Sequence, residues 1–136
     1  MKPVIKILIL DKEEIIFKSI KKALNNHDVM EYELIYSTNA FDGLKYIRSS
    51  KIDLVLIDLV LPGMNAIEAI RRIKNIDPKI TVVIMSGFTP SSIRLERNSG
   101  LQDDTLNNTA GILLKPFTTD EIKSLLLRLL KPGMLN

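Results

Sequence analysis

Residues 52–63 read Ile-Asp-Leu-Val-Leu-Ile-Asp-Leu-Val-Leu-Pro-Gly, and this stretch decides the fold of the whole chain. It is almost continuously apolar and ends in a Pro-Gly turn, which is typical of a strand buried on both faces at the centre of a parallel sheet. Asp58 lies near the carboxyl end of the run. A buried carboxylate without a partner is costly, so this acid is expected to face a crevice. Ligands of open α/β sheets bind in the crevice beyond the strand ends, which makes Asp58 the first candidate functional residue.

Apolar segments with strand character alternate with amphipathic segments of helical period along the rest of the chain. Asp11, with Glu14 three positions later, suggests a helix cap close to a capping box, and Thr118 with Glu121 suggests a second one. Five strands alternating with five helices predict a doubly wound, parallel α/β sheet with helices on both faces. The expected strands are 4–10, 33–37, 52–61, 80–85 and 111–114, and the expected helices are 12–24, 39–48, 66–76, 91–97 and 119–130. Helical spacing places Ile15, Ile16, Ile20, Ala23 and Leu24 on the buried side of the first helix.

Length and composition indicate one globular domain. The 136 residues suffice for a single core between two helical layers, so we expect one domain over residues 1–136 with its core at about 4–131. The net charge of +3 is mild and no basic run with interleaved aromatics occurs, so direct nucleic-acid binding is not expected. The chain has no cysteine, which excludes thiolate chemistry and fits a cytoplasmic location. No run approaches the ~18 apolar residues of a membrane span, so no membrane association is expected.

Four polar residues follow or end strands of the predicted sheet. Asp11 follows the first strand, Asp58 ends the third, Ser86 follows the fourth and Lys115 follows the fifth. Because the carboxyl ends of parallel strands share one edge, these side chains are expected to converge. An aspartate can attack a phosphoryl group and hold it as an acyl phosphate, while cations neutralise the phosphoryl oxygens. The set therefore predicts phosphoryl chemistry at Asp58.

These motifs together resemble the receiver domain of two-component response regulators, over about residues 6–130. Asp58 is followed by Leu-Pro-Gly-Met at the third to sixth positions after it, Ser86 lies in Ile-Met-Ser-Gly, and Lys115 lies in Leu-Leu-Lys-Pro-Phe. The resemblance implies a flavodoxin-like sheet with strand order 2-1-3-4-5. It implies that Asp58 takes a phosphoryl group from a histidine kinase or phosphotransfer protein. Lys115 would contact that group, Ser86 would move to bond it, and Pro116 would follow a cis peptide bond.

The resemblance also implies a cofactor and partners. Mg²⁺ would be held at Asp11, Asp58 and Val60, and a downstream protein effector would read the phosphorylated state. With no attached effector within the 136 residues, output would come from binding a partner, unless the chain is part of a longer regulator; homodimer formation is left open. Val60 and Phe88 lie two residues after Asp58 and Ser86 and offer little to orient water, so slow self-dephosphorylation is expected.

Three features depart from the receiver pattern. Receivers usually carry a second acid after the first strand, as a direct metal ligand, and here that position is Lys12. An ammonium there removes an oxygen ligand that Mg²⁺ prefers and adds repulsion. The position that is usually aromatic, three before Lys115, is Ile112, so an aromatic rotamer switch cannot operate in the usual way. The interval between Ser86 and Lys115 is several residues longer than is typical, so the fourth helix and its approach are expected to be remodelled.

Two other functions are open at this point. In the first, the chain is a pseudo-receiver that binds partners without Mg²⁺ or phosphorylation, with Lys12 filling the place of the metal; a solvated Lys12 is the competing interpretation. In the second, Asp58 is the nucleophile of a phosphohydrolase. Such enzymes have an Asp-x-Asp motif at this point, and here Val60 stands in place of the second aspartate. The signalling function is therefore the preferred interpretation, and enzymatic activity is not expected.

Overall fold

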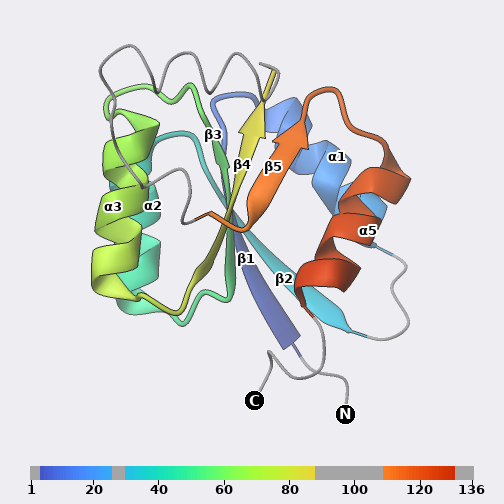
Figure 1. The fold of residues 1–136 in the computed structure, drawn as a ribbon, viewed down its shortest axis with the longest axis horizontal. Coiled ribbons are helices and arrows are strands. Elements are labelled where there is room, and N and C mark those ends of the chain that lie inside the picture. Colours follow the sequence, from blue (N-terminus) through green and yellow to red (C-terminus); the bar gives the residue numbers. More distant parts are fainter. Residues whose placement is uncertain (1–3, 26–29, 88–108, 131–136) are drawn as a thin grey trace.

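The computed structural model describes residues 4–25, 30–87 and 109–130 of the chain (Figure 1). Five parallel strands form one sheet in the order β2-β1-β3-β4-β5. The predicted fold class and strand order are therefore confirmed. The second strand begins at residue 31 rather than 33, and the third is shorter than the apolar run that predicted it. The strands are β1 (Val4–Leu10), β2 (Glu31–Ser37), β3 (Leu54–Asp58), β4 (Thr81–Ser86) and β5 (Gly111–Leu114).

The central strand β3 is buried along its whole length, as the apolar run predicts. It pairs with β1 on one side and with β4 on the other. The register aligns Ile57 with Leu10, and Asp58 with Met85. Strands β1, β3 and β4 therefore end at nearly the same level, which brings the residues that follow them to one edge.

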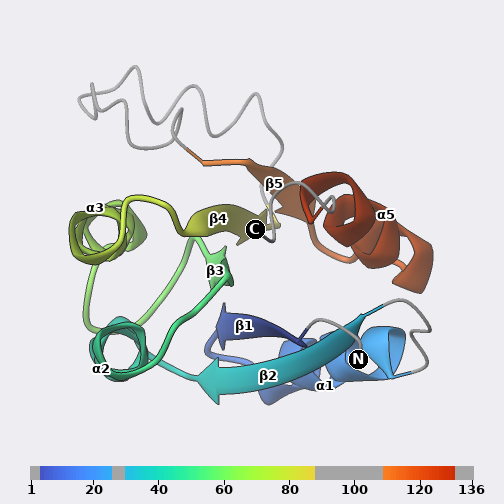
Figure 2. The ribbon, with the colours of Figure 1, turned by 90° about the horizontal axis from the view of Figure 1, so that it is seen from below.

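Four helices cover the two faces of the sheet in the described residues. Figure 2 shows α2 (Ala40–Ser49) and α3 (Ala66–Ile76) on one face, with α1 (Glu14–Leu24) and α5 (Thr119–Leu129) on the other. The helix expected at 91–97, and the longer interval before Lys115, lie outside the described residues. None of the helices in the described ranges is long and apolar enough to cross a membrane.

Each face of the sheet buries its own apolar cluster. Ile7 and Ile9 of β1 point to the cluster beneath α1 and α5, whereas Leu8 and Leu10 point to the cluster beneath α2 and α3. This alternation follows from the two-residue period of a strand, because successive side chains point to opposite faces. A strand that must contribute to both clusters has to be apolar throughout, which explains the unbroken apolar run of β3.

Side-chain caps start three of the helices in the described residues. Asn39 and Asn65 accept hydrogen bonds from main-chain N–H groups at the starts of α2 and α3, and Thr118 forms the predicted capping box with Glu121 at α5. Helix α1 differs, because its N-cap residue is Glu13 and no side chain caps it.

The predicted cap at Asp11 is therefore wrong, as is the predicted burial of Ile15. Asp11 Oδ1 accepts a hydrogen bond from the N–H of Glu13, which forms a local turn ahead of the helix and delays its start to Glu14. The first turn of α1 consequently lies at the edge of the sheet, where Ile15 is 62% exposed. The later apolar residues Ile20, Ala23 and Leu24 are buried as expected.

Candidate phosphoacceptor site

Asp58 is the last residue of β3 and is 6% exposed. Its Oδ1 accepts a hydrogen bond of 3.0 Å from the main-chain N–H of Val60, and its Oδ2 accepts one of 2.9 Å from the ammonium of Lys115. The carboxylate is thus compensated by one main-chain donor and one cation. Burying a carboxylate is tolerable when it is hydrogen-bonded and paired in this way.

Asp11 comes directly after β1 and is fully buried. Its Oδ2 lies 2.5 Å from Lys115 Nζ, while its Oδ1 is held by the N–H of Glu13. Burial raises the pKa of the Asp11 carboxyl above 3.8, and the hydrogen bond from Lys115 opposes this effect. The negative charge of Asp58 raises the same pKa further. Both oxygens of Asp11 therefore have partners, and the group depends on Lys115 for its charge balance.

Lys115 follows β5, and its ammonium bridges the two aspartates, so it joins residues that are 104 and 57 positions away in the sequence. Burial alone would lower the pKa of Lys115, but the hydrogen bonds and charges of Asp11 and Asp58 outweigh burial and raise it above 10.5. The side chain is 17% exposed, so a ligand can approach the ammonium from solvent. The peptide bond between Lys115 and Pro116 is cis, as the resemblance to receivers implied.

Ser86 is the last residue of β4 and is buried. Its main-chain carbonyl accepts a hydrogen bond of 2.8 Å from the N–H of Lys115, which ties the end of β4 to the residue that follows β5. The structure therefore brings Asp11, Asp58, Ser86 and Lys115 to the carboxyl edge of the sheet, where the sequence predicted them.

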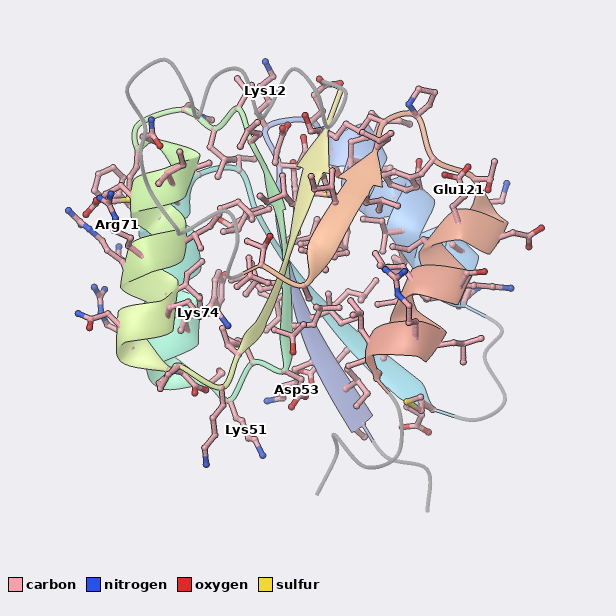
Figure 3. The ribbon with its side chains drawn as sticks, in the orientation of Figure 1. Lys12, Lys51, Asp53, Arg71, Lys74 and Glu121 are labelled. Atoms are coloured by element: carbon pink, nitrogen blue, oxygen red, sulfur yellow. The ribbon has the colours of Figure 1, made fainter. Side chains whose placement is uncertain are left out.

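The cation between the two carboxylates is Lys115, not Lys12. Lys12 is exposed, and Figure 3 shows its side chain at the carboxyl edge of the sheet, directed away from the molecule. The interpretation that Lys12 fills the place of the metal is therefore wrong, because the turn after β1 directs Asp11 inward and its neighbour outward. The pseudo-receiver hypothesis therefore keeps only the missing second acid at position 12 and the isoleucine at position 112 in its support.

The donors at this edge suit a hard divalent cation. Asp11 and Asp58 supply carboxylates, and the only donor atom that Val60 can offer a metal is its main-chain carbonyl oxygen. Magnesium is commonly held by one or two carboxylates while it keeps several waters. No group of three or more His, Cys, Asp or Glu side chains with metal-ligand geometry occurs in the described part of the chain. The residues therefore fit Mg²⁺ as a site with two protein carboxylates, in which Lys115 competes for the same oxygens.

Sequence reasoning missed one residue at this edge, Tyr36. Its phenol donates a hydrogen bond of 2.9 Å to the main-chain carbonyl of Asp11. The signal that was available is indirect: the strand order places β2 beside β1, so the end of β2 must adjoin the turn that carries Asp11. That the hydroxyl reaches the carbonyl follows only from the three-dimensional structure.

The arrangement of strand ends, acidic pair and bridging lysine matches a known family. The family model described as "Response regulator receiver domain" matches residues 7–127. The chain belongs to this family. The receiver domain is 30% identical to sporulation initiation phosphotransferase F from Bacillus subtilis over 118 residues, which are 87% of each chain. By contrast, the chain spans only 11% of the CAI-1 autoinducer sensor kinase/phosphatase of Vibrio cholerae, to which it is 32% identical over 76 residues.

Solved structures show the same fold. The signal receiver domain of a putative Luxo repressor protein from Vibrio parahaemolyticus superposes with a TM-score of 0.76 at 20% identity, covering 99% of this chain and 95% of that one. A response regulator protein from Burkholderia pseudomallei, crystallised with a phosphorylated aspartic acid, a calcium ion and citrate, has a TM-score of 0.70 at 16% identity. That match covers 90% of this chain and 66% of the other. At these identities the likeness concerns the fold alone.

Proposed function

We propose that this receiver domain accepts a phosphoryl group on Asp58 from the phosphohistidine of a histidine kinase or phosphotransfer protein. The observation that carries the proposal is the ammonium of Lys115, bonded at once to Asp11 and Asp58 at the carboxyl edge. The phosphorylated aspartic acid in the related Burkholderia pseudomallei protein supports the same chemistry. The relative from Bacillus subtilis is named as a phosphotransferase, which agrees with a role in relaying phosphoryl groups.

In the transfer step, a carboxylate oxygen of Asp58 forms a new O–P bond while the P–N bond of the phosphohistidine breaks. The histidine nitrogen keeps the electron pair of that bond and takes up a proton from solvent. Lys115 is protonated at neutral pH, because the two carboxylates raise its pKa, and its ammonium can therefore neutralise the incoming phosphoryl oxygens. The N–H of Val60 holds one oxygen of Asp58 and so orients the carboxylate for attack.

Magnesium would be held by Asp11, Asp58 and the carbonyl of Val60, and it would supply further positive charge at the phosphoryl oxygens. The family's second acid is replaced by Lys12, which is exposed and provides no ligand. We therefore expect a lower affinity for Mg²⁺ than an intact acidic pair would give. Charge neutralisation in this chain consequently depends more on Lys115.

Output is expected through a protein surface. Movement of Ser86 toward the phosphoryl group would pull on the strand pair that β4 forms with β5, because the carbonyl of Ser86 is bonded to the N–H of Lys115. The surface of β5 and α5 carries three exposed apolar side chains, Ile112, Leu114 and Leu127, which suit contact with a protein effector. The exposed valine at position 60 offers no group that could orient water, which supports slow loss of the phosphoryl group.

The test is incubation with acetyl phosphate and Mg²⁺, followed by intact-mass measurement. The wild type should gain the mass of one phosphoryl group, and Asp58→Asn should gain none. Asp53→Asn is the matched control, because Asp53 lies just before the same strand and its carboxylate accepts a hydrogen bond from the main-chain N–H of Lys6. A wild type that gains no mass, or a gain that persists in Asp58→Asn, would contradict the proposal.

A further inference from the structure

The turn that carries Asp11 is held from the side by strand β2. The phenol of Tyr36 donates to the main-chain carbonyl of Asp11 at 2.9 Å, and the main-chain N–H of Asp11 donates to the carbonyl of Ser37 at 3.2 Å. Both main-chain polar groups of Asp11 are thus bonded to consecutive residues of one neighbouring strand. The register supports this, because Leu10 pairs with Ser37 at the last position of the β1–β2 ladder.

The tyrosine ring is itself fixed. It stacks on Phe17 of α1, with ring centroids 4.9 Å apart and an interplanar angle of 15°. The phenol is the donor of its hydrogen bond, because the carbonyl of Asp11 can only accept. Because stacking already restricts the ring, the hydroxyl loses little conformational entropy when it donates to the turn. The hydrogen bond can therefore hold the turn in place.

The geometry points to Tyr36 as a positioning residue, whose phenol holds the turn at residues 11–13 so that the Asp11 carboxylate stays against Lys115. Asp11 Oδ1 is bonded within this turn to the N–H of Glu13, so a shift of the turn would move the carboxylate with it. Lys115 would then lose one of the two partners that place it beside Asp58. The inference rests on the proposed function, because such positioning affects a rate only if Asp58 takes up a phosphoryl group.

Tyr36→Phe tests this inference, because it removes only the hydroxyl and keeps the ring that stacks on Phe17. Tyr46→Phe is the matched control: Tyr46 lines the same hollow of about 480 Å³ as Tyr36, and its phenol makes no hydrogen bond in the described residues. The maximal rate of Asp58 phosphorylation by acetyl phosphate with Mg²⁺ should fall about three- to tenfold in Tyr36→Phe, the loss expected for one neutral hydrogen bond. The half-saturating acetyl phosphate concentration should stay unchanged, because the Tyr36 hydroxyl bonds the main-chain carbonyl of Asp11 and not the side chains of Asp58 or Lys115.

Hydrogen exchange gives a second measurement that does not depend on phosphorylation. The amides of Asp11 and Glu13 should exchange faster in Tyr36→Phe than in the wild type, and at the wild-type rate in Tyr46→Phe. Unchanged exchange at these amides, an unchanged maximal rate, or an equal loss in both variants would overturn the inference. If the wild type takes up no phosphoryl group, the proposed function fails, and the exchange rates alone decide whether Tyr36 holds the turn.

Discussion

Asp53 directly precedes strand β3 and Asp58 is its last residue, and the two acids are held in different ways. Asp53 lies at the amino edge (Figure 3). Its Oδ2 accepts a hydrogen bond from the N–H of Lys6, and its main chain bonds to Lys6 and Thr81. At the carboxyl edge, Asp58 is bonded to the main-chain N–H of Val60, two residues on, and to the side-chain ammonium of Lys115. An acid bonded to the main chain of a neighbouring strand is part of the scaffold, whereas one bonded to a side chain can exchange that partner for a ligand.

The lysines at the two edges differ in the same way. Lys74 donates to the main-chain carbonyl of Ile80, and burial lowers its pKa below 10.5. Lys115 is also partly buried, yet its two carboxylate partners raise its pKa above 10.5. The same residue type therefore serves a structural contact at one edge and a charged site at the other. The neighbouring acids, rather than the degree of burial, decide the difference.

The largest expected effect is the loss of stability when each lysine is replaced by methionine. Lys115→Met leaves two buried carboxylates facing each other without a cation, so the free energy of unfolding at pH 7 should fall by about 2–4 kcal/mol. Lys74→Met removes one hydrogen bond to a carbonyl and should cost about 1 kcal/mol. Urea unfolding measures the free energy of unfolding of both variants. Equal losses would contradict the difference between the two edges.

The second-largest expected effect is a change in Mg²⁺ affinity when the charge of a lysine at one edge of the sheet is reversed. Lys12→Asp places a carboxylate beside Asp11, so the Kd for Mg²⁺ should decrease by at least about tenfold, from the Coulomb energy of reversing a charge at short range. Lys51→Asp makes the same charge change at the amino edge and should leave the Kd nearly unchanged (Figure 3). Calorimetric titration with Mg²⁺ gives both constants. A similar gain in both variants would indicate an effect of net charge rather than of a charge placed close to the site.

The smallest effect is a difference in alkaline pH dependence. Because the folded-state pKa of Lys115 is raised, its contribution to stability is complete below pH 10.5 and is lost as the pH rises through the folded pKa. The pKa of Lys74 is lowered, so the cost of burying its charge disappears as the pH rises toward 10.5. Unfolding measured across pH 8–11.5 should show that Lys115→Met removes a fall in stability and Lys74→Met removes a rise. Slopes of the same sign would show that one of the two assignments is wrong.

Local sequence patterns predicted much of the fold, because the interactions behind them join residues that are close in the sequence. The caps at Asn39 and Asn65 and the capping box at Thr118 need only residues within one turn of a helix, and the capping box forms as predicted. The start of α1 was predicted wrongly, because Asp11 bonds the N–H of Glu13 instead of capping a helix that starts beside it. There, a contact with Lys115 and a place at the sheet edge compete with the local signal.

The sequence predicted which distant residues lie at the same edge of the sheet, but not which of their side chains are in contact. The order of the strands and their common direction suffice to place Asp11, Asp58, Ser86 and Lys115 at one edge. Which of two lysines lies between the carboxylates depends on the direction in which each side chain leaves its loop. The hydrogen bond from Tyr36 to Asp11 likewise depends on the relative heights of β1 and β2.

By itself the sequence determined the buried central strand, the acid at its end and the strand ends that meet beside it, because hydrophobic periodicity and parallel topology depend on residue type and order. The tertiary structure alone decided that Lys115 bridges Asp11 and Asp58, that Lys12 faces solvent, and that Tyr36 supports the turn. Such pairings are decided by distances of a few ångströms between loops. Those distances are set by the packing of the whole domain, so no local pattern in the sequence records them.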